Sequence, residues 1–261
     1  MITEARLGHL LFAAAFVALG VESLLLGIPV MRLELWPKAY PDAALVGYLS
    51  GALCLAGGAA LLAPSWARRG ALVLALMTLL WVALLHLPHL IPTITHADYW
   101  TGTAECLAVS ASAWVLAALL PERSAAGLLD RIAAAGIPYG RICFGLSLLV
   151  FAASHFIYHD FVASFIPAWI PYRLFFAYAT GAAHGAAGLA ILSGILPRLA
   201  ATLAGIMYAS WVLILHIPRV AAAAHDPFEW NGVFVASALS AGAFLVAASF
   251  APRSRADFRA A

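Results

Sequence analysis

The chain has 261 residues, of which 64% are hydrophobic and only 10% are charged, and its formal net charge is +2. A typical soluble domain carries about 25% charged residues, so this chain lacks the polar residues needed to cover its surface in water. A soluble globular protein is therefore excluded. No nucleic-acid-binding motif, phosphate-binding loop or serine-nucleophile signature is present either. The composition predicts a protein whose solvent is the lipid bilayer.

Apolar stretches of about 20 residues, the length a helix needs to cross the hydrocarbon core, recur along the whole chain. The eight stretches are residues 7–27, 44–63, 70–91, 102–120, 139–158, 174–196, 199–217 and 233–250. Lipid offers no partner for free backbone groups, and no alternating pattern of barrel strands occurs. The sequence therefore predicts an all-α integral membrane protein with eight transmembrane helices.

The first stretch resembles a signal peptide because Arg6 precedes an apolar run. However, the run is long, Glu22 interrupts it, and no small-residue cleavage site follows. We therefore interpret it as a transmembrane helix.

The segment WVALLHLPH at residues 81–89 returns as WVLILHIPR at residues 211–219, an offset of 130. The same offset relates Tyr48/Tyr178, Gly51/Gly181, Gly58/Gly188, Arg68/Arg198, Trp100/Trp230, Gly102/Gly232 and Ser110/Ser240. Nearer the start of each half the offset becomes about 133, which places Trp36 opposite Trp169 and Glu22 opposite His155. A fixed internal offset of this length indicates a duplication. We expect two parallel four-helix repeats, at residues 1–123 and 139–261, joined by a cytoplasmic connector at 124–138.

Two shorter features complete the organisation of the chain. The connector contains the pattern AAGLLDRIAAAG, which predicts a turn of helix at the membrane surface. Cys54, Cys106 and Cys143 all fall within apolar stretches and form no CxxC pair. Neither a disulfide framework nor a thiol redox motif is indicated, so we interpret the cysteines as small core residues.

The basic residues predict the orientation. With both termini in the cytoplasm, ten arginines lie on the inner side and four basic residues lie outside, as the positive-inside rule requires. The inner residues are Arg6, Arg68, Arg69, Arg123, Arg131, Arg141, Arg198, Arg253, Arg255 and Arg259, and the outer ones are Arg32, Lys38, Arg173 and Arg219. The sequence thus predicts a multi-pass protein of the inner (plasma) membrane. An even number of helices in each half makes the repeats parallel, so equivalent residues lie at equal depth.

In this topology eight of the nine histidines lie toward the outer face, and only His9 lies on the inner side. Intramembrane ionisable groups are costly and usually face a cavity or the bundle interior. Imidazole suits copper, iron, zinc or haem, and carboxylates can complete or orient such a site. The candidate metal ligands are His155, His159, His184, His216, His86 and His89, and the candidate cofactor-binding residues are Glu22, Glu105, Trp81 and Trp211. The outer-loop residues His96 and His225 are weaker candidates.

A structural interpretation of these residues stays open beside the functional one. The pattern Leu-His-Ile-Pro marks a helix end, where the histidine would cap carbonyls freed by the proline and the tryptophans would form an interfacial belt. None of the histidine spacings is as specific as HExxH.

Residues 151–192, FAASHFIYHDFVASFIPAWIPYRLFFAYATGAAHGAAGLAIL, resemble the DoxX family. The matching elements are a His-Phe element, a Pro-x-Trp-hydrophobic-Pro loop and a Thr-Gly helix opening, and they correspond to His155, Phe156, Pro167, Trp169, Pro171, Thr180 and Gly181. The first half shows the resemblance more faintly. Two departures are His184, where many relatives have glutamate, and the sequence His216-Ile217-Pro218-Arg219, which replaces a Pro-x-Asn ending.

The resemblance implies a four-helix membrane bundle, and related DoxD-type proteins are subunits of thiosulfate:quinone oxidoreductases. Two classes of function stay open. In the first, the protein is a membrane-embedded oxidoreductase subunit whose outer pocket binds a quinone, copper or haem and which works with a redox partner protein. In the second, it is a non-catalytic membrane partner or small-molecule carrier in which the histidines are structural and small-residue helices pack closely.

Overall fold

The computed structural model describes residues 3–37, 42–96, 98–121 and 127–251. All regular structure in these ranges is helical, and eight helical runs are long and apolar enough to cross a membrane. This confirms the predicted all-α membrane fold. The runs are Glu4–Leu26 (α1), Ala43–Leu62 (α2), Ala67–Leu90 (α3 to α4), Tyr99–Leu119 (α5, which begins at Asp98), Leu128–Ile157 (α6 and α7), Arg173–Ser193 (α9), Pro197–Ala222 (α10 to α11) and Pro227–Ser249 (α12).

The third and seventh runs each contain two α-helices, and one short helix lies outside the runs. Their bounds are Ala67–Trp81 (α3), Leu87–Leu90 (α4), Pro197–Trp211 (α10), Ile217–Ala222 (α11) and His159–Phe165 (α8, between α7 and α9). The connector forms Leu128–Ala134 (α6), as its sequence predicts, and Gly136–Ile157 (α7) follows at once.

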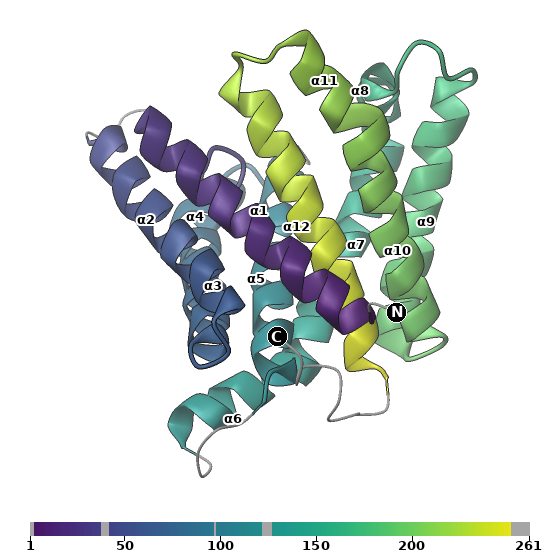
Figure 1. Cartoon of the computed structure of the whole chain (residues 1–261). Helices are drawn as coiled ribbons and strands as arrows, with labels where there is room; N and C mark the ends of the chain where they lie inside the picture. The colour runs from purple at the N-terminus through teal and green to yellow at the C-terminus, as the bar shows by residue number, and fades with distance from the viewer. Residues whose placement is uncertain (1–2, 38–41, 97, 122–126, 252–261) are drawn as a thin grey trace.

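The first helix begins and the last one ends at the same end of the bundle, at the bottom of Figure 1. These two helices, α1 and α12, pack closely near that end, since a Cβ atom on Gly8 would lie 2.9 Å from the carbonyl oxygen of Ala241 and from Cγ of Leu245. We call this the terminal end and the opposite one the far end. The loops after α1, α4, α8 and α11 lie at the far end (Figure 1).

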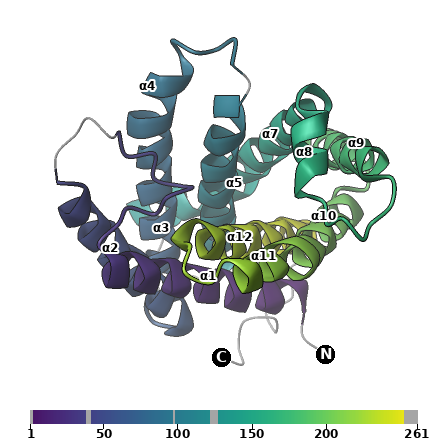
Figure 2. The same ribbon diagram turned by 90° about the horizontal axis from the view of Figure 1, so that it is seen from above.

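The two halves use the same helix neighbours. In the first half α1 packs on α2, α2 on α3 and α3 on α5, and in the second half α7 packs on α9, α9 on α10 and α10 on α12. Between the halves α1 packs on α12, α5 packs on α7, and α5 and α12 contact each other. Figure 2 shows α5 and α12 in the middle of the bundle. Each half is therefore a separate set of packed helices, and α5 and α12 join the two sets in the middle of the bundle.

Equivalent contacts occur in the two halves. Ser110 Oγ donates to the Ala75 carbonyl and Ser240 Oγ to the Gly205 carbonyl, both at 2.8 Å. Across the interfaces between the halves, Gly8 packs on Ala241 and Leu245 of α12, and Gly140 packs on Ala111 and Val115 of α5. Contacts exchanged reciprocally in this way are those of a two-fold arrangement.

The reciprocal contacts correct the offset predicted for the first helix of each half. Gly8 corresponds to Gly140, and Glu22, which accepts from Asn231, corresponds to Ser154, which accepts from Thr101. The offset there is 132, because the close glycine contacts between helices fix the register. His155 therefore lies opposite Ser23, and the prediction that it pairs with Glu22 is wrong.

A wider helical turn stands at the same place in each half. The π-helical segments Val82–His86 (η1) and Val212–His216 (η2) each end on a histidine, and the amide of the next residue donates five residues back. Pro88 and Pro218 follow two residues later. A proline ring clashes with the carbonyl four residues before it, and the wider turn relieves that clash. Such π-turns frequently occur at functional sites.

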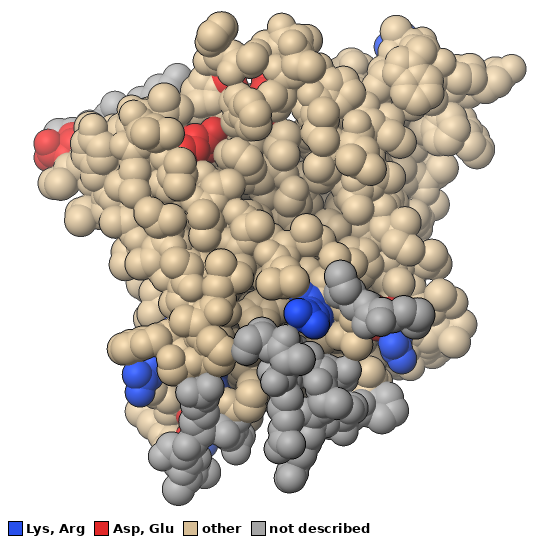
Figure 3. All heavy atoms as spheres, viewed as in Figure 1, with Lys and Arg blue, Asp and Glu red and all other residues tan. Residues whose placement is uncertain are grey.

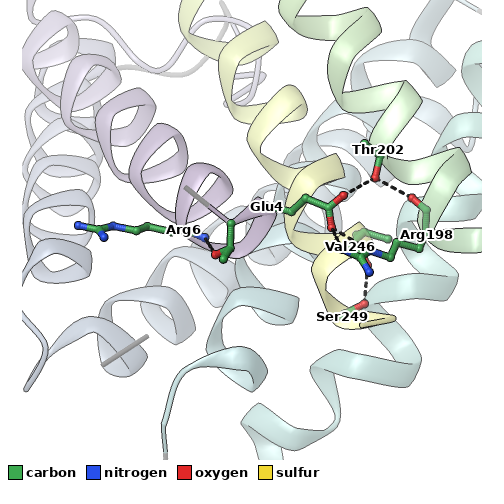
Figure 4. Close-up of polar contacts among 7 residues, drawn as sticks. Glu4, Arg6, Arg198, Thr202, Val246 and Ser249 are labelled. Atoms are coloured by element: carbon green, nitrogen blue, oxygen red, sulfur yellow. Dashed lines mark hydrogen bonds and ion pairs between the residues drawn. The ribbon is translucent and has the colours of Figure 1, made fainter. Parts of the chain in front are cut away.

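Ion pairs link helices at the terminal end. The Glu4 carboxylate of α1 reaches α10, where it accepts from Arg198 at 2.9–3.0 Å and from Thr202 Oγ1 at 2.8 Å (Figure 4). Arg68 occupies the equivalent position in α3 and pairs at 3.4 Å with Asp130 of α6. In each half the arginine that starts the third span thus pairs with an acid from another part of the bundle.

Charge is unevenly distributed between the two ends. The face drawn in Figure 3 is uncharged over most of its middle, and its blue atoms lie mainly at the lower, terminal end. Among the described residues, the terminal end carries Arg6, Arg68, Arg69, Arg131, Arg141 and Arg198, and the far end carries Arg32, Arg173 and Arg219. Lys38, Arg123, Arg253, Arg255 and Arg259 lie outside the described residues.

Candidate functional site

Four aromatic and imidazole side chains meet inside the second half. We call His155 of α7, His184 of α9, and Tyr208 and Trp211 of α10 the imidazole cluster. The ring centroids of His155 and His184 are 4.9 Å apart, and His184 Nε2 lies 3.0 Å from the Tyr208 hydroxyl. The Trp211 ring lies 5.5 Å from His184 and 6.1 Å from His155.

Burial in the cluster is graded. His184 and Tyr208 are buried, at 1% and 2% exposure, whereas His155 and Trp211 are half-buried. His155 Nδ1 lies 2.8 Å from the carbonyl oxygen of Phe151, so Nδ1 carries the proton of the neutral ring and Nε2 is left to accept. The cluster thus offers a phenol, two imidazoles and aromatic surface in an apolar setting.

The equivalent positions of the first half hold smaller side chains. Ser23, Cys54 and Thr78 stand where the second half has His155, His184 and Tyr208, and Trp81 matches Trp211. All four are buried. Small side chains leave room in a helical bundle, and in this half the loop after α1 fills it.

The loop between α1 and α2 enters the interior of the first half, and Figure 2 shows it running inward over the far end. Val30 and Leu33 have no exposed surface and Glu34 is 3% exposed. The Glu34 carboxylate accepts from Ser50 Oγ at 2.7 Å and from the Val30 amide at 3.2 Å. Burial raises the pKa of Glu34, and these two hydrogen bonds offset part of that rise.

The corresponding loop of the second half stays at the surface. No residue from His155 to Phe176 is buried, and Trp169 and Tyr172 are 73% and 82% exposed. An open cavity of about 430 Å³ lies beside α8 and is lined by Asp160, Ala163, Ser164, Tyr172, Arg173 and Leu174. Unlike the loop that holds Glu34, this loop therefore places no buried residue inside its half.

The histidines that end the two π-turns have different partners. His86 is 3% exposed and donates from Nε2 to the carbonyl of Leu33 at 2.9 Å. His216 is half-buried, and its Nδ1 atom is buried without a hydrogen-bond partner. A Cβ atom on Gly232 would lie 3.0 Å from His216 Nδ1 and 3.2 Å from an Arg32 amino nitrogen, so the arginine and the imidazole meet at this glycine. Neither histidine faces away from the bundle.

A buried carboxylate lies where α1 meets α12. Glu22 Oε2 accepts from Asn231 Nδ2 at 2.8 Å, and Asn231 Oδ1 accepts from the Arg32 amide at 3.1 Å. Glu22 Oε1 is buried and has no hydrogen-bond partner. Glu105 of α5 lies within electrostatic range of both Arg32 and Tyr208. This polar region stands between the halves, close to His216.

The remaining candidates lie apart from the imidazole cluster. His89 lies 3.1 Å from the Leu85 carbonyl within its own helix. His159 stacks on Tyr178 at 5.1 Å and lies 3.5 Å from Asp160. His96 and His225 are exposed. Among the described residues, His155 and His184 are the one pair of histidine rings in contact.

Four contributors to these sites were not predicted: Tyr208, Arg32, Glu34 and Asn231. Tyr208 has a threonine as its repeat counterpart, so the duplication gave no signal for it. Arg32 and Glu34 fall in a loop, and a loop residue carries no helical periodicity that indicates its direction. Asn231 lies before the predicted stretch 233–250 and falls within a helix only in the structure, where α12 begins at Pro227; its position beside the repeated pair Gly102/Gly232 was the one signal that could have identified it.

Across the described ranges, no group of three or more His, Cys, Asp or Glu side chains is arranged to hold a metal ion. The imidazole cluster contributes two ligands of that kind, with a phenol and an indole beside them. Comparison of the chain with family models, curated proteins and solved structures gives no match.

Proposed function

We propose that the protein is a membrane-embedded subunit of a quinone-linked oxidoreductase, with the imidazole cluster as the site for the quinone head group. The observation that carries the proposal is the buried pair of His184 and Tyr208, 3.0 Å apart, with His155 and Trp211 against them. A quinone requires hydrogen-bond donors for its carbonyl oxygens and apolar walls for its ring, and cofactor sites in general combine these features.

The cluster suits proton exchange with such a ligand. Reduction of a quinone to a quinol consumes two electrons and two protons, and we assign the electrons to a redox partner protein. Imidazole titrates near neutral pH in water and exchanges protons readily. The Tyr208 hydroxyl can donate to a carbonyl oxygen while it accepts from His184. The resemblance of residues 151–192 to DoxX proteins supports the same class of function.

A quinone site needs fewer protein ligands than the copper or haem sites that the histidines also suggest. Two imidazoles in contact, with no third His, Cys, Asp or Glu side chain grouped with them among the described residues, favour a quinone over a metal. Structural histidines in a carrier or scaffold form the second candidate, which the bonds of His86 and His89 to backbone carbonyls favour.

Binding of decylubiquinone to the purified protein in detergent tests the proposal. The wild type should bind about one molecule. His184→Ala and Tyr208→Phe should each weaken binding by about tenfold, since a lost hydrogen bond costs about 1.4 kcal/mol. The exposed His96→Ala variant is the control and should bind as the wild type does. Absence of saturable binding by the wild type, together with no metal and no visible absorbance, would favour the carrier or scaffold.

We place the protein in the inner (plasma) membrane with both termini in the cytoplasm. The excess of arginine at the terminal end supports this orientation. The imidazole cluster, the π-turns and the open cavity then lie toward the outer side.

A further inference from the structure

The open cavity at the far end has one wall from α8 and the other from the start of α9. Figure 1 shows the two helices beside each other, and they are in contact. His159 of α8 stacks on Tyr178 of α9 at 5.1 Å, which holds the two walls together. The volume of about 430 Å³ falls within the range of pockets that hold small ligands, about 300–1,000 Å³.

The two walls carry opposite charges that do not pair with each other. In the part of the chain that the structure describes, the Arg173 guanidinium has no hydrogen bond, ion pair or ring contact. On the other wall Asp160 and Ser164 lie four residues apart on α8, so they share a helix face. Asp160 Oδ2 lies 3.5 Å from His159 Nε2, and Asp160 Oδ1 has no partner among the described residues.

The α8 wall therefore presents oxygen acceptors. Ser164 Oγ donates to the carbonyl of Phe161 at 2.6 Å, and its lone pairs can still accept. The Asp160 carboxylate is an acceptor only, and the Arg173 guanidinium on the opposite wall is a donor only. A ligand that fits both walls has an anionic group and, at its other end, a cationic group that can donate.

The cavity lies at the depth of phospholipid headgroups. The membrane-spanning stretch of α9 begins at Arg173, which lines the cavity. Trp169 and Tyr172, just before it, are exposed, and such aromatic side chains gather at the boundary between headgroups and hydrocarbon. Phe161 and Phe175 are each 65% exposed beside the two walls. A charged cavity with apolar surface around it suits a molecule with a polar head and acyl chains.

We propose that this cavity binds the headgroup of phosphatidylethanolamine, a phospholipid with one phosphate and one primary ammonium group. Arg173 donates to the phosphate oxygens, and the ammonium donates to the Asp160 carboxylate and to Ser164 Oγ. Leu174 and Phe175, exposed at the start of α9, lie beside the acyl chains. The inference is independent of the proposed function, because no residue of the imidazole cluster takes part in it.

The walls select this lipid over two others. Phosphatidylglycerol is anionic and has no cation to place beside Asp160, so the carboxylate repels it. Phosphatidylcholine has both charges, but its quaternary ammonium has no N–H group to donate, and proteins typically recognise such a group with a cage of aromatic rings. Among the described residues that line the cavity, Tyr172 is the one aromatic residue. A primary ammonium has three N–H donors and matches the acceptors of α8.

Native mass spectrometry of the purified full chain tests the inference, with the three lipids carrying identical acyl chains and titrated in detergent. Phosphatidylethanolamine should bind about fivefold more tightly than the other two, as expected for one charged contact at an exposed site. Arg173→Gln should weaken phosphatidylethanolamine and phosphatidylcholine alike, because both carry the phosphate. Asp160→Asn and Ser164→Ala should weaken phosphatidylethanolamine alone. Arg69→Gln, which removes an exposed arginine at the terminal end, is the matched control and should bind as the wild type does.

Soluble phosphoethanolamine distinguishes the lipid from its headgroup. At the same concentration as the lipid it should not displace it, because the acyl chains add apolar contacts. Displacement would show that the occupant is a water-soluble phosphate and that the inference is wrong. Equal affinities of the wild type for the three lipids would also contradict it, and so would wild-type affinities in both Arg173→Gln and Asp160→Asn. Because both side chains are exposed, the two variants should melt in lipid-free detergent at the temperature of the wild type.

Discussion

Glu22 and Ser154 occupy equivalent positions in the two halves, and each accepts a hydrogen bond of 2.8 Å from the helix of the other half that packs against it. The donor is Asn231 for Glu22 and Thr101 for Ser154. One interface between the halves thus holds a buried acid and an amide, whereas the other holds two hydroxyl groups. The polar region around Arg32 and His216 lies beside the first interface only.

Replacement of Asn231 should therefore be more damaging than replacement of its counterpart. Asn231→Leu leaves Glu22 Oε2 and the Arg32 amide without their partner, and it should lower the free energy of unfolding by about 1–3 kcal/mol. Thr101→Val removes a single neutral hydrogen bond, worth about 0.6 kcal/mol inside a membrane protein. Unfolding of both variants by a denaturing detergent measures the difference. Equal losses would contradict an asymmetric interface.

Glu34 should make stability depend on pH. Burial raises its pKa in the folded protein, so the neutral acid is favoured by folding. Its contribution is complete below the pKa of an exposed glutamate, about 4.3, and is lost as pH rises through the raised folded value. Glu34→Gln, which stays neutral and keeps an acceptor for Ser50, should flatten this decline. Melting temperatures at about pH 5 and about pH 8 measure it. If the fall in melting temperature between these pH values is as large in Glu34→Gln as in the wild type, another titrating group causes it.

The close approach of α1 to α2 should not tolerate a methyl group. A Cβ atom on Gly20 would lie 2.4 Å from the Leu55 amide nitrogen, so Gly20→Ala should destabilise the protein by about 1–3 kcal/mol. In the second half, a Cβ atom on Gly185 would meet only Ala152 Cβ at 3.5 Å. Gly185→Ala should be neutral or stabilising, because alanine favours a helix by about 1 kcal/mol over glycine. Thermal unfolding of both variants tests this difference. Equal melting temperatures for Gly20→Ala and Gly185→Ala would contradict it.

The orientation of the protein in the membrane can be tested independently of the proposed ligand site. A reporter fused after Ala261 should be active only if it functions in the cytoplasm, because eight spans return the chain to the side on which it started. A second reporter fused after Ala223, at the far end, should give the opposite result. Activity of a periplasmic reporter at Ala261 would reverse the orientation and place the imidazole cluster on the inner side.

The sequence predicted several elements of the site because their signal is local. The repeated Trp-x-x-x-x-His-x-Pro segment identified Trp81, His86, Trp211 and His216, and the structure places both histidines at the end of a π-turn. His155 and His184 were expected from their apolar surroundings, and their rings are in contact. The sequence could not show that His89 and His159 lie apart from this pair, because equal depth along a bundle axis leaves the direction of each side chain undetermined.

The length and composition of the apolar stretches by themselves determined the all-α membrane fold and its eight spans, because a bilayer of fixed thickness sets the length of every spanning helix. The repeated segments determined the internal offset, because a duplication leaves the same residues at a constant spacing. The tertiary structure decided the register of the first helices, where a difference of one residue turns a side chain by about 100° and exchanges Glu22 for Ser23 as the counterpart of His155. It also decided that the loop holding Glu34 enters the interior of one half, while the loop holding Trp169 stays at the surface of the other. Packing across the whole bundle determines where a loop goes, and the sequence of the loop carries no such information.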